Sequence, residues 1–347
     1  MRAFLESLSV VACTLVQAGG KGTIGLAKEF SPRGAATSPH DASRILSPAG
    51  DLALPGAPVR FDYQSGDSAS GVLYISHMND GHIVAFDTRS RRVVGNIPDM
   101  PRVTGVWVVS ELHKLYASVT GRHQVAVINL PSLAVRATAG PIGFPDGIAY
   151  APEAKRVFVS DESGGGELVI DGVTDRVIST IPLGGEAGNT KYDPGSGCIL
   201  VAVQTSNEIV AIDPSTATVV ARYALTKGDH PHGMYVDAPN RVLFVANQGN
   251  ATIELVDLRT MEVTDIVAVG DDPDVLAYDA AWGRLYVATE GGGLWAYAVR
   301  GHRLALEGVL DLPHAHTVSV DPVTHLVYLP LQNLGGKPVL RMLKGLP

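Results

Sequence analysis

Residues 228–257, GDHPHGMYVDAPNRVLFVANQGNATIELVD, contain a unit that recurs along the whole of this 347-residue chain. One apolar or aromatic position marks each copy, at intervals of 42, 42, 43, 43, 42 and 42 residues. The seven marked residues are Tyr74, Tyr116, Phe158, Val201, Phe244, Tyr286 and Tyr328. A repeat period near 42 residues is typical of propellers, in which each repeat forms one four-stranded blade.

Each repeat contains the signals of four short strands. The marked runs, such as RVFVSD and VLFVAN, are rich in β-branched and aromatic residues and too short for helices. A second run follows each of them, and five of these second runs end in Asp or Asn, whose side chains favour a tight turn. A third run follows the turn, and a fourth run begins after a Gly/Pro-rich corner, as in HGMYVDAP. The sequence therefore predicts an all-β fold, a seven-bladed β-propeller with four antiparallel strands per blade.

The seventh repeat lacks its outer strand, because the chain stops at Pro347 after PVLRMLKGLP. An unassigned stretch, ILSPAGDLALPG, precedes the first complete repeat at residues 45–56. We expect residues 51–54 to pair beside the C-terminal strands. This pairing would close the ring and remove two exposed strand edges, so residues 46–347 form one propeller domain.

The charge of the chain bears on its partners. The formal net charge is −8, and the sequence contains no basic cluster, so we expect no nucleic-acid partner. We expect a monomer that binds a small molecule or a protein at one face of the central channel. Sequence signatures of other catalytic sites, namely GxSxG, HExxH and the P-loop, are absent from the sequence.

The N-terminus resembles a targeting segment. Arg2 precedes an apolar stretch that ends in a small-x-small pattern at Ala18, so residues 1–18 are expected to be a signal peptide. Residues 19–45 then form a flexible linker, and the protein is periplasmic or secreted, with no transmembrane segment after signal removal. If residues 1–18 are instead a plain extension, the protein is cytoplasmic.

The two cysteines allow a further alternative. Residues 10–13, VVAC, also resemble a bacterial lipobox, in which Cys13 would be lipidated. If Cys13 is removed with a signal peptide, Cys198 is unpaired, and we expect it to be a small core residue.

The repeat resembles the YVTN repeat of YncE-like propellers. The resemblance rests on PHG before the inner strand, VLFVAN on the next and a terminal Asp on the third, and it covers about residues 50–347. It implies the propeller fold. It implies no single function, because similar propellers bind ligands, bind proteins or carry catalysis.

Aligned corners place one residue per blade at the same point of the channel mouth. Counting along the repeat gives Val59, Thr104, Asp146, Gly188, His232, Asp274 and His316. A second tier lies two residues earlier, at His230, Asp272 and His314. Since alternate side chains of an extended segment point the same way, both tiers are expected to face the mouth.

Imidazoles and carboxylates on one ring suit one divalent transition metal, held by His232, His316, Asp146 and Asp274. In that interpretation His230 or His314 transfers a proton during a lyase or hydrolase reaction. Seven-bladed lyases of the virginiamycin B and peptidyl-amidating types are similar in using channel-mouth groups. The alternative is that each His or Asp only holds its corner by bonding to nearby backbone.

Four further residues follow the second strands at equivalent places: His77, Asp161, Gln204 and Asn247. They either select a ligand at the mouth, together with Thr104 and Asp272, or cap the next turn. The remaining histidines, including His82, are expected at the surface or in turns. Two functions follow: an exported scaffold that binds a small molecule or protein at the channel face, and a metal-dependent lyase or hydrolase.

Overall fold

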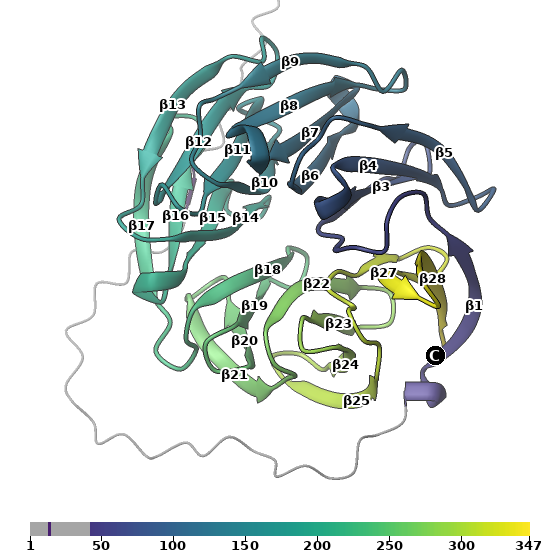
Figure 1. The fold of residues 1–347 in the computed structure, drawn as a ribbon. Coiled ribbons are helices and arrows are strands. Elements are labelled where there is room, and N and C mark those ends of the chain that lie inside the picture. Colours follow the sequence, from purple (N-terminus) through teal and green to yellow (C-terminus); the bar gives the residue numbers. More distant parts are fainter. Residues whose placement is uncertain (1–12, 15–41) are drawn as a thin grey trace, which may run out of the picture.

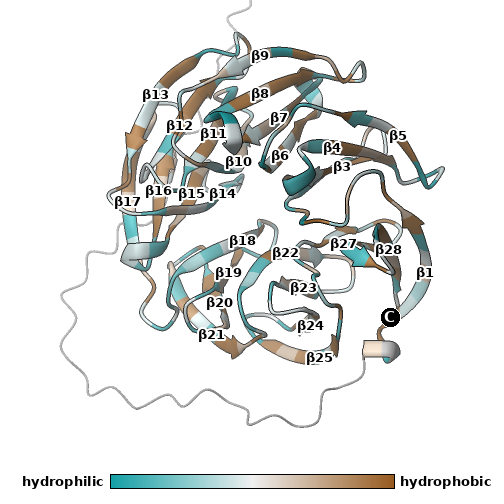
Figure 2. Cartoon of the chain, viewed as in Figure 1, coloured by the Kyte–Doolittle hydropathy of each residue, from teal (hydrophilic) through white to brown (hydrophobic). Residues whose placement is uncertain are grey.

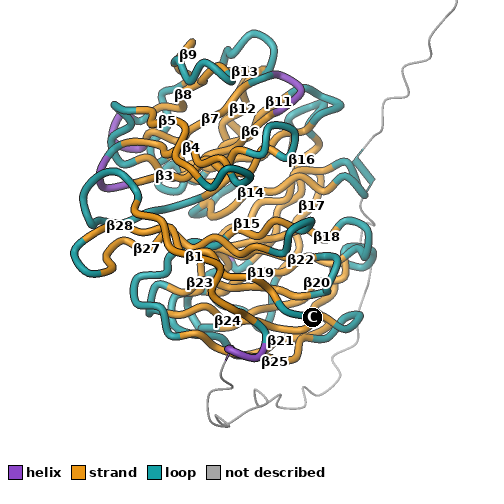
Figure 3. The backbone as a smooth tube through the Cα atoms, turned by 90° about the vertical axis from the view of Figure 1, so that its right-hand side faces the viewer, coloured by secondary structure: helices purple, strands orange, loops and turns teal. Residues whose placement is uncertain are grey.

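A computed structural model describes residues 13–14 and 42–347 of the chain. The described residues form seven four-stranded antiparallel sheets arranged around a central axis, as the sequence predicts (Figure 1). In the view turned by 90°, loops gather at both ends of the strands and so form the two faces of the ring (Figure 3). The proposed signal peptide and linker lie almost entirely outside the described residues.

The strands follow one another in the order of the repeats. Blade 1 comprises β2 (Gln64–Asp67), β3 (Val72–His77), β4 (His82–Asp87) and β5 (Arg92–Ile97), and blade 2 comprises β6 (Val103–Val109), β7 (Lys114–Val119), β8 (Gln124–Asn129) and β9 (Val135–Ala139). Blade 3 comprises β10 (Pro145–Ala151), β11 (Arg156–Asp161), β12 (Gly166–Asp171) and β13 (Val177–Pro182), and blade 4 comprises β14 (Ala187–Asp193), β15 (Cys198–Val203), β16 (Glu208–Asp213) and β17 (Thr218–Ala224).

The remaining blades complete the ring. Blade 5 comprises β18 (Pro231–Asp237), β19 (Val242–Asn247), β20 (Thr252–Asp257) and β21 (Glu262–Ala268), and blade 6 comprises β22 (Pro273–Asp279), β23 (Arg284–Thr289), β24 (Gly293–Val299) and β25 (Leu304–Leu310). Blade 7 comprises β26 (Ser319–Asp321), β27 (Leu326–Leu334), β28 (Lys337–Gly345) and the N-terminal strand β1 (Leu46–Ala53). Short 3-10 turns are η1 (Ala42–Arg44), η2 (Met78–Asp80), η3 (Ser110–Leu112), η4 (Thr120–Arg122) and η5 (Gln204–Ser206).

The core lies between neighbouring blades. Every residue of β15 and of β19 is buried, because each of these strands has another blade on both of its faces. The outer strand β17 instead alternates exposed and half-buried residues. The seven marked residues of the repeat are all buried, and brown, apolar segments run along the strands of every blade (Figure 2). The period therefore reports how blades pack on one another.

The ring closes through β1. It pairs antiparallel with β28 as the outer strand of blade 7, and the register joins Asp51 to Arg341 and Leu52 to Leu340. In Figure 1 the purple β1 lies beside the yellow C-terminal strands. The Arg341 guanidinium donates to both carboxylate oxygens of Asp51, at 3.0 and 2.8 Å. The closure expected for residues 51–54 is confirmed.

The expectation of an unpaired Cys198 is wrong. Cys13 forms a disulfide with Cys198, with the two Cα atoms 5.1 Å apart, and the Thr14 amide donates to the Ser196 carbonyl at 3.0 Å. The expectation treated Cys13 as lost with the signal peptide, and no spacing rule links cysteines 185 positions apart. Cleavage after Ala18, or lipidation of Cys13, is incompatible with this bond.

A search of residues 13–14 and 42–347 for membrane-spanning segments finds no helix of sufficient length and apolar character.

Candidate functional site

Most blades deliver one side chain to the channel mouth at or just before the start of the inner strand. In blades 2 to 6 a β-bulge interrupts the inner pairing at this point, for example between Pro145 and Ile148 and between Pro231 and Met234. A bulge bends its strand and re-aims a side chain, so the bulged Asp146 and His232 turn towards the axis. Both of these residues are buried.

A glycine follows several ring residues because the inner strands approach too closely for a side chain. A Cβ atom on Gly105 would lie 2.0 Å from the Asp146 carbonyl oxygen, and one on Gly233 would lie 1.7 Å from that of Asp274. Contacts of this length are impossible for a carbon atom. Each glycine therefore lets the next blade approach, and this close approach brings the ring residues together.

The blade 1 member of the ring is Asp62, and the expectation of Val59 is wrong. In blade 1, Gln64 pairs with Ile75, and in blade 2 the equivalent pair is Val106 and Ala117. Gln64 and Val106 are therefore equivalent positions. Two residues before each of them lie Asp62 and Thr104, which are therefore also equivalent. The segment PVRFDY has no glycine corner to align, and this concealed the correct position. Counting back from the marked residue Tyr74 would have found it.

The channel-mouth residues form a buried cluster with two halves, one around His316 and one around His232. His316 lies at the centre of the first half. Its Nε2 lies 3.2 Å from Asp62 Oδ1 and 3.1 Å from Asp274 Oδ2. Arg60 Nη2 lies 2.9 Å from the same nitrogen, and Arg60 also donates to Glu290 at 2.9 and 3.3 Å. With Glu290 Oε1 at 3.3 Å from Nδ1, three carboxylates and a guanidinium converge on one imidazole.

His232 lies at the centre of the second half. Its Nε2 is 3.2 Å from Asp274 Oδ1 and 3.9 Å from Asp146 Oδ2. The Tyr63 hydroxyl donates to Asp146 Oδ2 at 3.0 Å and lies 3.2 Å from His232 Nε2. Asn189 Nδ2 donates to this hydroxyl at 3.3 Å. Asp274 therefore bridges the two imidazoles, and six blades contribute to the cluster around Asp274 and His232.

The surroundings of the two buried acids, Asp274 and Asp146, give them very different pKa values. Burial acts to raise the pKa of Asp274, but the charges of His232 and His316 lower it to about 2. Burial raises the pKa of Asp146 to about 8, against the opposing charge of His232. Burial acts to lower the pKa of His232, yet Asp274, followed by Asp146, raises it to about 10. Near neutral pH, Asp274 is charged, Asp146 is protonated and His232 is cationic.

A cavity of about 240 Å³ opens on this cluster. Its ionisable lining residues are Arg60, Asp62, Asp146, Glu162, His232, Asp272, Asp274 and Glu290. Tyr63, Met78, Thr104, Phe144 and Gln248 complete the wall. A larger groove, of about 480 Å³, lies between blades 1 and 7 and contains none of the ring residues. Because the smaller cavity contains the buried charges, it is the better candidate site.

The second-tier side chains do not point in the same direction as the side chains that form the ring at the channel mouth. His230, Asp272 and His314 have φ angles of 51°, 52° and 64°, in the left-handed region, and all three are exposed. Side-chain alternation holds only for extended backbone, so the expected pairing of tier and ring fails. His230 instead lies 3.1 Å from Asp229, while Asp272 lines the rim of the cavity.

Most of the strand-end residues hold turns. Asp161 accepts hydrogen bonds from the amides of Gly143, Phe144 and Gly164. Gln204 donates to Glu162 at 3.2 Å, and Asn247 donates to the Thr252 hydroxyl, also at 3.2 Å.

Two other expected site residues, Thr104 and His77, are also buried. The Thr104 hydroxyl donates to the Pro145 carbonyl at 2.8 Å and thereby links neighbouring blades. His77 is buried against His82, and the expectation that His82 lies at the surface or in a turn is wrong.

Within the described residues, two groups bring three potential metal ligands within 4.8 Å of one another. The first is Asp62, Asp274 and His316, and the second is His77, Asp80 and His82. Of the four ligands expected from the sequence, Asp274 and His316 belong to the first group. His232 and Asp146 lie on the far side of Asp274, and Asp62 takes their place.

Comparisons with known proteins support the fold alone. The chain matches no family model, and no curated protein shows detectable sequence similarity to it. Among solved structures, a chain of Kuenenia stuttgartiensis hydrazine synthase superposes with a TM-score of 0.70 at 14% identity, covering 82% of this chain and 96% of its own. A chain of the mitotic checkpoint complex superposes with a TM-score of 0.73 at 12% identity, covering 93% and 98%.

We predict that folding stability falls as pH rises from about 6.5 towards 10. A histidine in the unfolded chain loses its proton near pH 6.5, whereas folded His232 retains it to about pH 10. The stabilising charge is therefore fully present below pH 6.5 and is lost as pH rises through the folded pKa. Thermal unfolding followed by circular dichroism should show a smaller fall in His232→Gln. His113→Gln, at an exposed histidine, should keep the parent slope. Equal slopes in all three proteins would contradict the assignment.

Proposed function

We propose that this propeller binds a small cationic molecule in the cavity at the channel mouth. The observation that carries the proposal is the charge of the wall, where six carboxyl groups face one guanidinium and one imidazole. Even with Asp146 protonated, and with His316 and the buried Lys191 counted as cations beside the wall, the five remaining carboxyl groups outnumber the four cationic groups. A positively charged ligand would balance them.

Unsatisfied polar atoms beside the cavity agree with such a ligand. Asn189 Oδ1 is buried and has no hydrogen-bond partner among the described residues. It lies on the amide that bonds to Tyr63, a residue of the cavity wall. Buried polar atoms are normally paired, so this oxygen is an acceptor without a donor directly behind the cavity wall.

The size and aromatic lining of the cavity also favour a small cation. A volume of about 240 Å³ lies below the usual range for drug-sized ligands, so it suits a small molecule better than a peptide segment. The rings of Tyr63 and Phe144 line the wall. Aromatic faces attract cations, and Phe144 already lies 5.7 Å from the Arg102 guanidinium carbon.

A second candidate is a metal-dependent lyase or hydrolase, favoured by the convergence of Asp62, Asp274 and His316. Two carboxylates and one imidazole suit Mn²⁺, Fe²⁺ or Zn²⁺. A metal held there would polarise a substrate oxygen or activate a water molecule. Asp274 and Asp62 raise the pKa of His316 despite its burial, so a metal bound there would displace the imidazole proton and bind more weakly as pH falls. The binding function is preferred because it accounts for the charge of the whole cavity wall and not of three residues alone.

We infer that the protein belongs with the YVTN-type, YncE-like propellers and works outside the cytoplasm. The repeat in residues 228–257 supports the first point. The Cys13–Cys198 disulfide supports the second, because such bonds persist in oxidising compartments such as the periplasm or the extracellular space. In this proposal the mature protein retains Cys13.

We expect small amines to raise the melting temperature, whereas carboxylates and neutral alcohols of matched size leave it unchanged. Thermal unfolding with such a panel would measure this. Asp272→Asn should weaken binding roughly 3- to 10-fold, because it removes one charge contact at the rim while asparagine tolerates the left-handed backbone. Asp311→Asn, at an exposed aspartate outside the cavity wall, is the control. Stabilisation by anions alone, or by no small molecule, would contradict the proposal and direct the search to a protein partner.

For the second candidate, protein purified without chelator or metal resin should contain at least about one equivalent of transition metal. Asp62→Asn should contain about one equivalent less than the parent, because an amide replaces one of the two carboxylate ligands, and Asp311→Asn should match the parent. Elemental analysis of the three proteins provides the measurement. A metal content unaffected by Asp62→Asn would rule out this site as the metal centre.

The disulfide predicts the thiol state of protein isolated from its native compartment. Alkylation under denaturing conditions should label no thiol before reduction and two thiols after it, as read by intact mass. The intact mass also reports the N-terminus. Two free thiols before reduction, or a chain that begins at Gly19, would contradict retention of the bond.

A further inference from the structure

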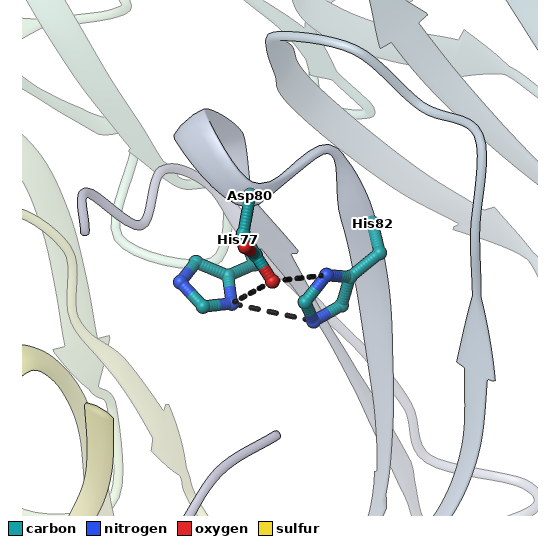
Figure 4. Close-up of side chains that lie close together, drawn as sticks. All are labelled: His77, Asp80 and His82. Atoms are coloured by element: carbon teal, nitrogen blue, oxygen red, sulfur yellow. Dashed lines mark hydrogen bonds and ion pairs between the residues drawn. The ribbon is translucent and has the colours of Figure 1, made fainter. Parts of the chain in front are cut away.

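We propose that His77, Asp80 and His82 form a zinc site in the turn between β3 and β4, separate from the channel-mouth cluster. Figure 4 shows the three side chains facing one another across this turn. Two imidazoles and one carboxylate form a common ligand set for zinc and leave a fourth position for water. The proposal does not depend on the ligand of the channel.

The distances between the donor atoms suit one small cation. His77 Nδ1 lies 3.3 Å from His82 Nε2 and 3.9 Å from Asp80 Oδ2. Asp80 Oδ2 lies 3.0 Å from His82 Nδ1. Zinc bonds of 2.0–2.1 Å in a tetrahedron separate neighbouring ligand atoms by about 3.3 Å. A small rotation of the His82 ring would present a single nitrogen to the shared point.

The local backbone brings these donors together. His77 and His82 are directly paired across the β3–β4 hairpin, so their side chains lie on the same face of the sheet. Between them, η2 and a left-handed Gly81, with φ of 70°, turn the chain so that Asp80 returns over both rings. The spacing His-x-x-Asp-x-His thus places three ligands within one tight turn.

Burial gives a second, independent observation. His77 has no exposed surface, and its ring stacks on Phe61 at 4.0 Å. The backbone groups of Val59 and Ala57 interact with the ring, while its Nδ1 faces Asp80 and His82. Backbone contacts of this kind fix the orientation of a metal-binding histidine.

The segment that follows β1 covers the three ligands. Gly56, with φ of +100°, lies so close that a Cβ atom would be 2.1 Å from Asp80 Oδ2 and under 3 Å from both imidazoles. The Asn79 amide donates to the Arg60 carbonyl at 3.3 Å. A metal here would therefore stabilise the β3–β4 turn. This turn packs beneath the segment that leads from the closing strand to Arg60 and Asp62.

The experiment uses the full-length protein, stripped of metal with a chelator and titrated with ZnCl₂ by calorimetry. The parent should bind one zinc ion at this site and gain melting temperature. Asp80→Asn should weaken that binding by at least about 10-fold, and His82→Gln should abolish it. Asp62→Asn and Asp311→Asn should bind as the parent does. Co²⁺ in place of Zn²⁺ gives a spectroscopic readout of imidazole coordination.

Several outcomes would overturn the proposal. These are a parent that binds no zinc, zinc binding lost in Asp62→Asn, or zinc binding that persists in both Asp80→Asn and His82→Gln. Asp80 is partly exposed, so Asp80→Asn keeps the test decisive if His82→Gln fails to fold. Loss of zinc binding in that variant, with amine binding unchanged, would support a zinc site distinct from the channel.

Discussion

The inner strands converge so tightly that a Cβ atom cannot fit at Gly105 or Gly233, and the rest of the site depends on this crowding. With no room for side chains between adjacent blades at these points, the preceding residues bulge and turn towards the axis. Repeated around the ring, this geometry gathers polar groups from distant parts of the sequence. Chemistry in a propeller is thus assembled by packing, and each blade contributes through a single short corner.

Gathering charged groups away from water is costly unless each is paired. Asp274 reduces that cost by lying between His232 and His316, whereas Asp146 avoids it by remaining protonated and accepts a hydrogen bond from Tyr63. The pairing is incomplete at the rim, where carboxyl groups remain in excess. The inner half of the cluster is therefore balanced within the protein, while the outer half suits an added cation.

The sequence predicted the parts of the structure that repeat. The period gave the seven blades, and the same count placed Asp146, His232, Asp274 and His316 at equivalent corners, because the bulge recurs. Some errors occur where repetition stops, because Asp62 follows a segment without a glycine corner. Another concerns a feature that does repeat: His230, Asp272 and His314 all adopt a left-handed backbone, to which the alternation rule does not apply. Cys13 pairs with a residue that no spacing connects to it.

Closure by β1 has a consequence for the order of events during synthesis. Leu46 is among the first described residues to leave the ribosome, yet its partner in the sheet is Gly345, close to the end of the chain. Long-range pairing of this kind forms late, because a large loop must close first. Blades 1 to 6 contain all of their own strands, so they can form while β1 is unpaired and the ring is an open arc. The ring closes only after β28 has been synthesised and has paired with β1.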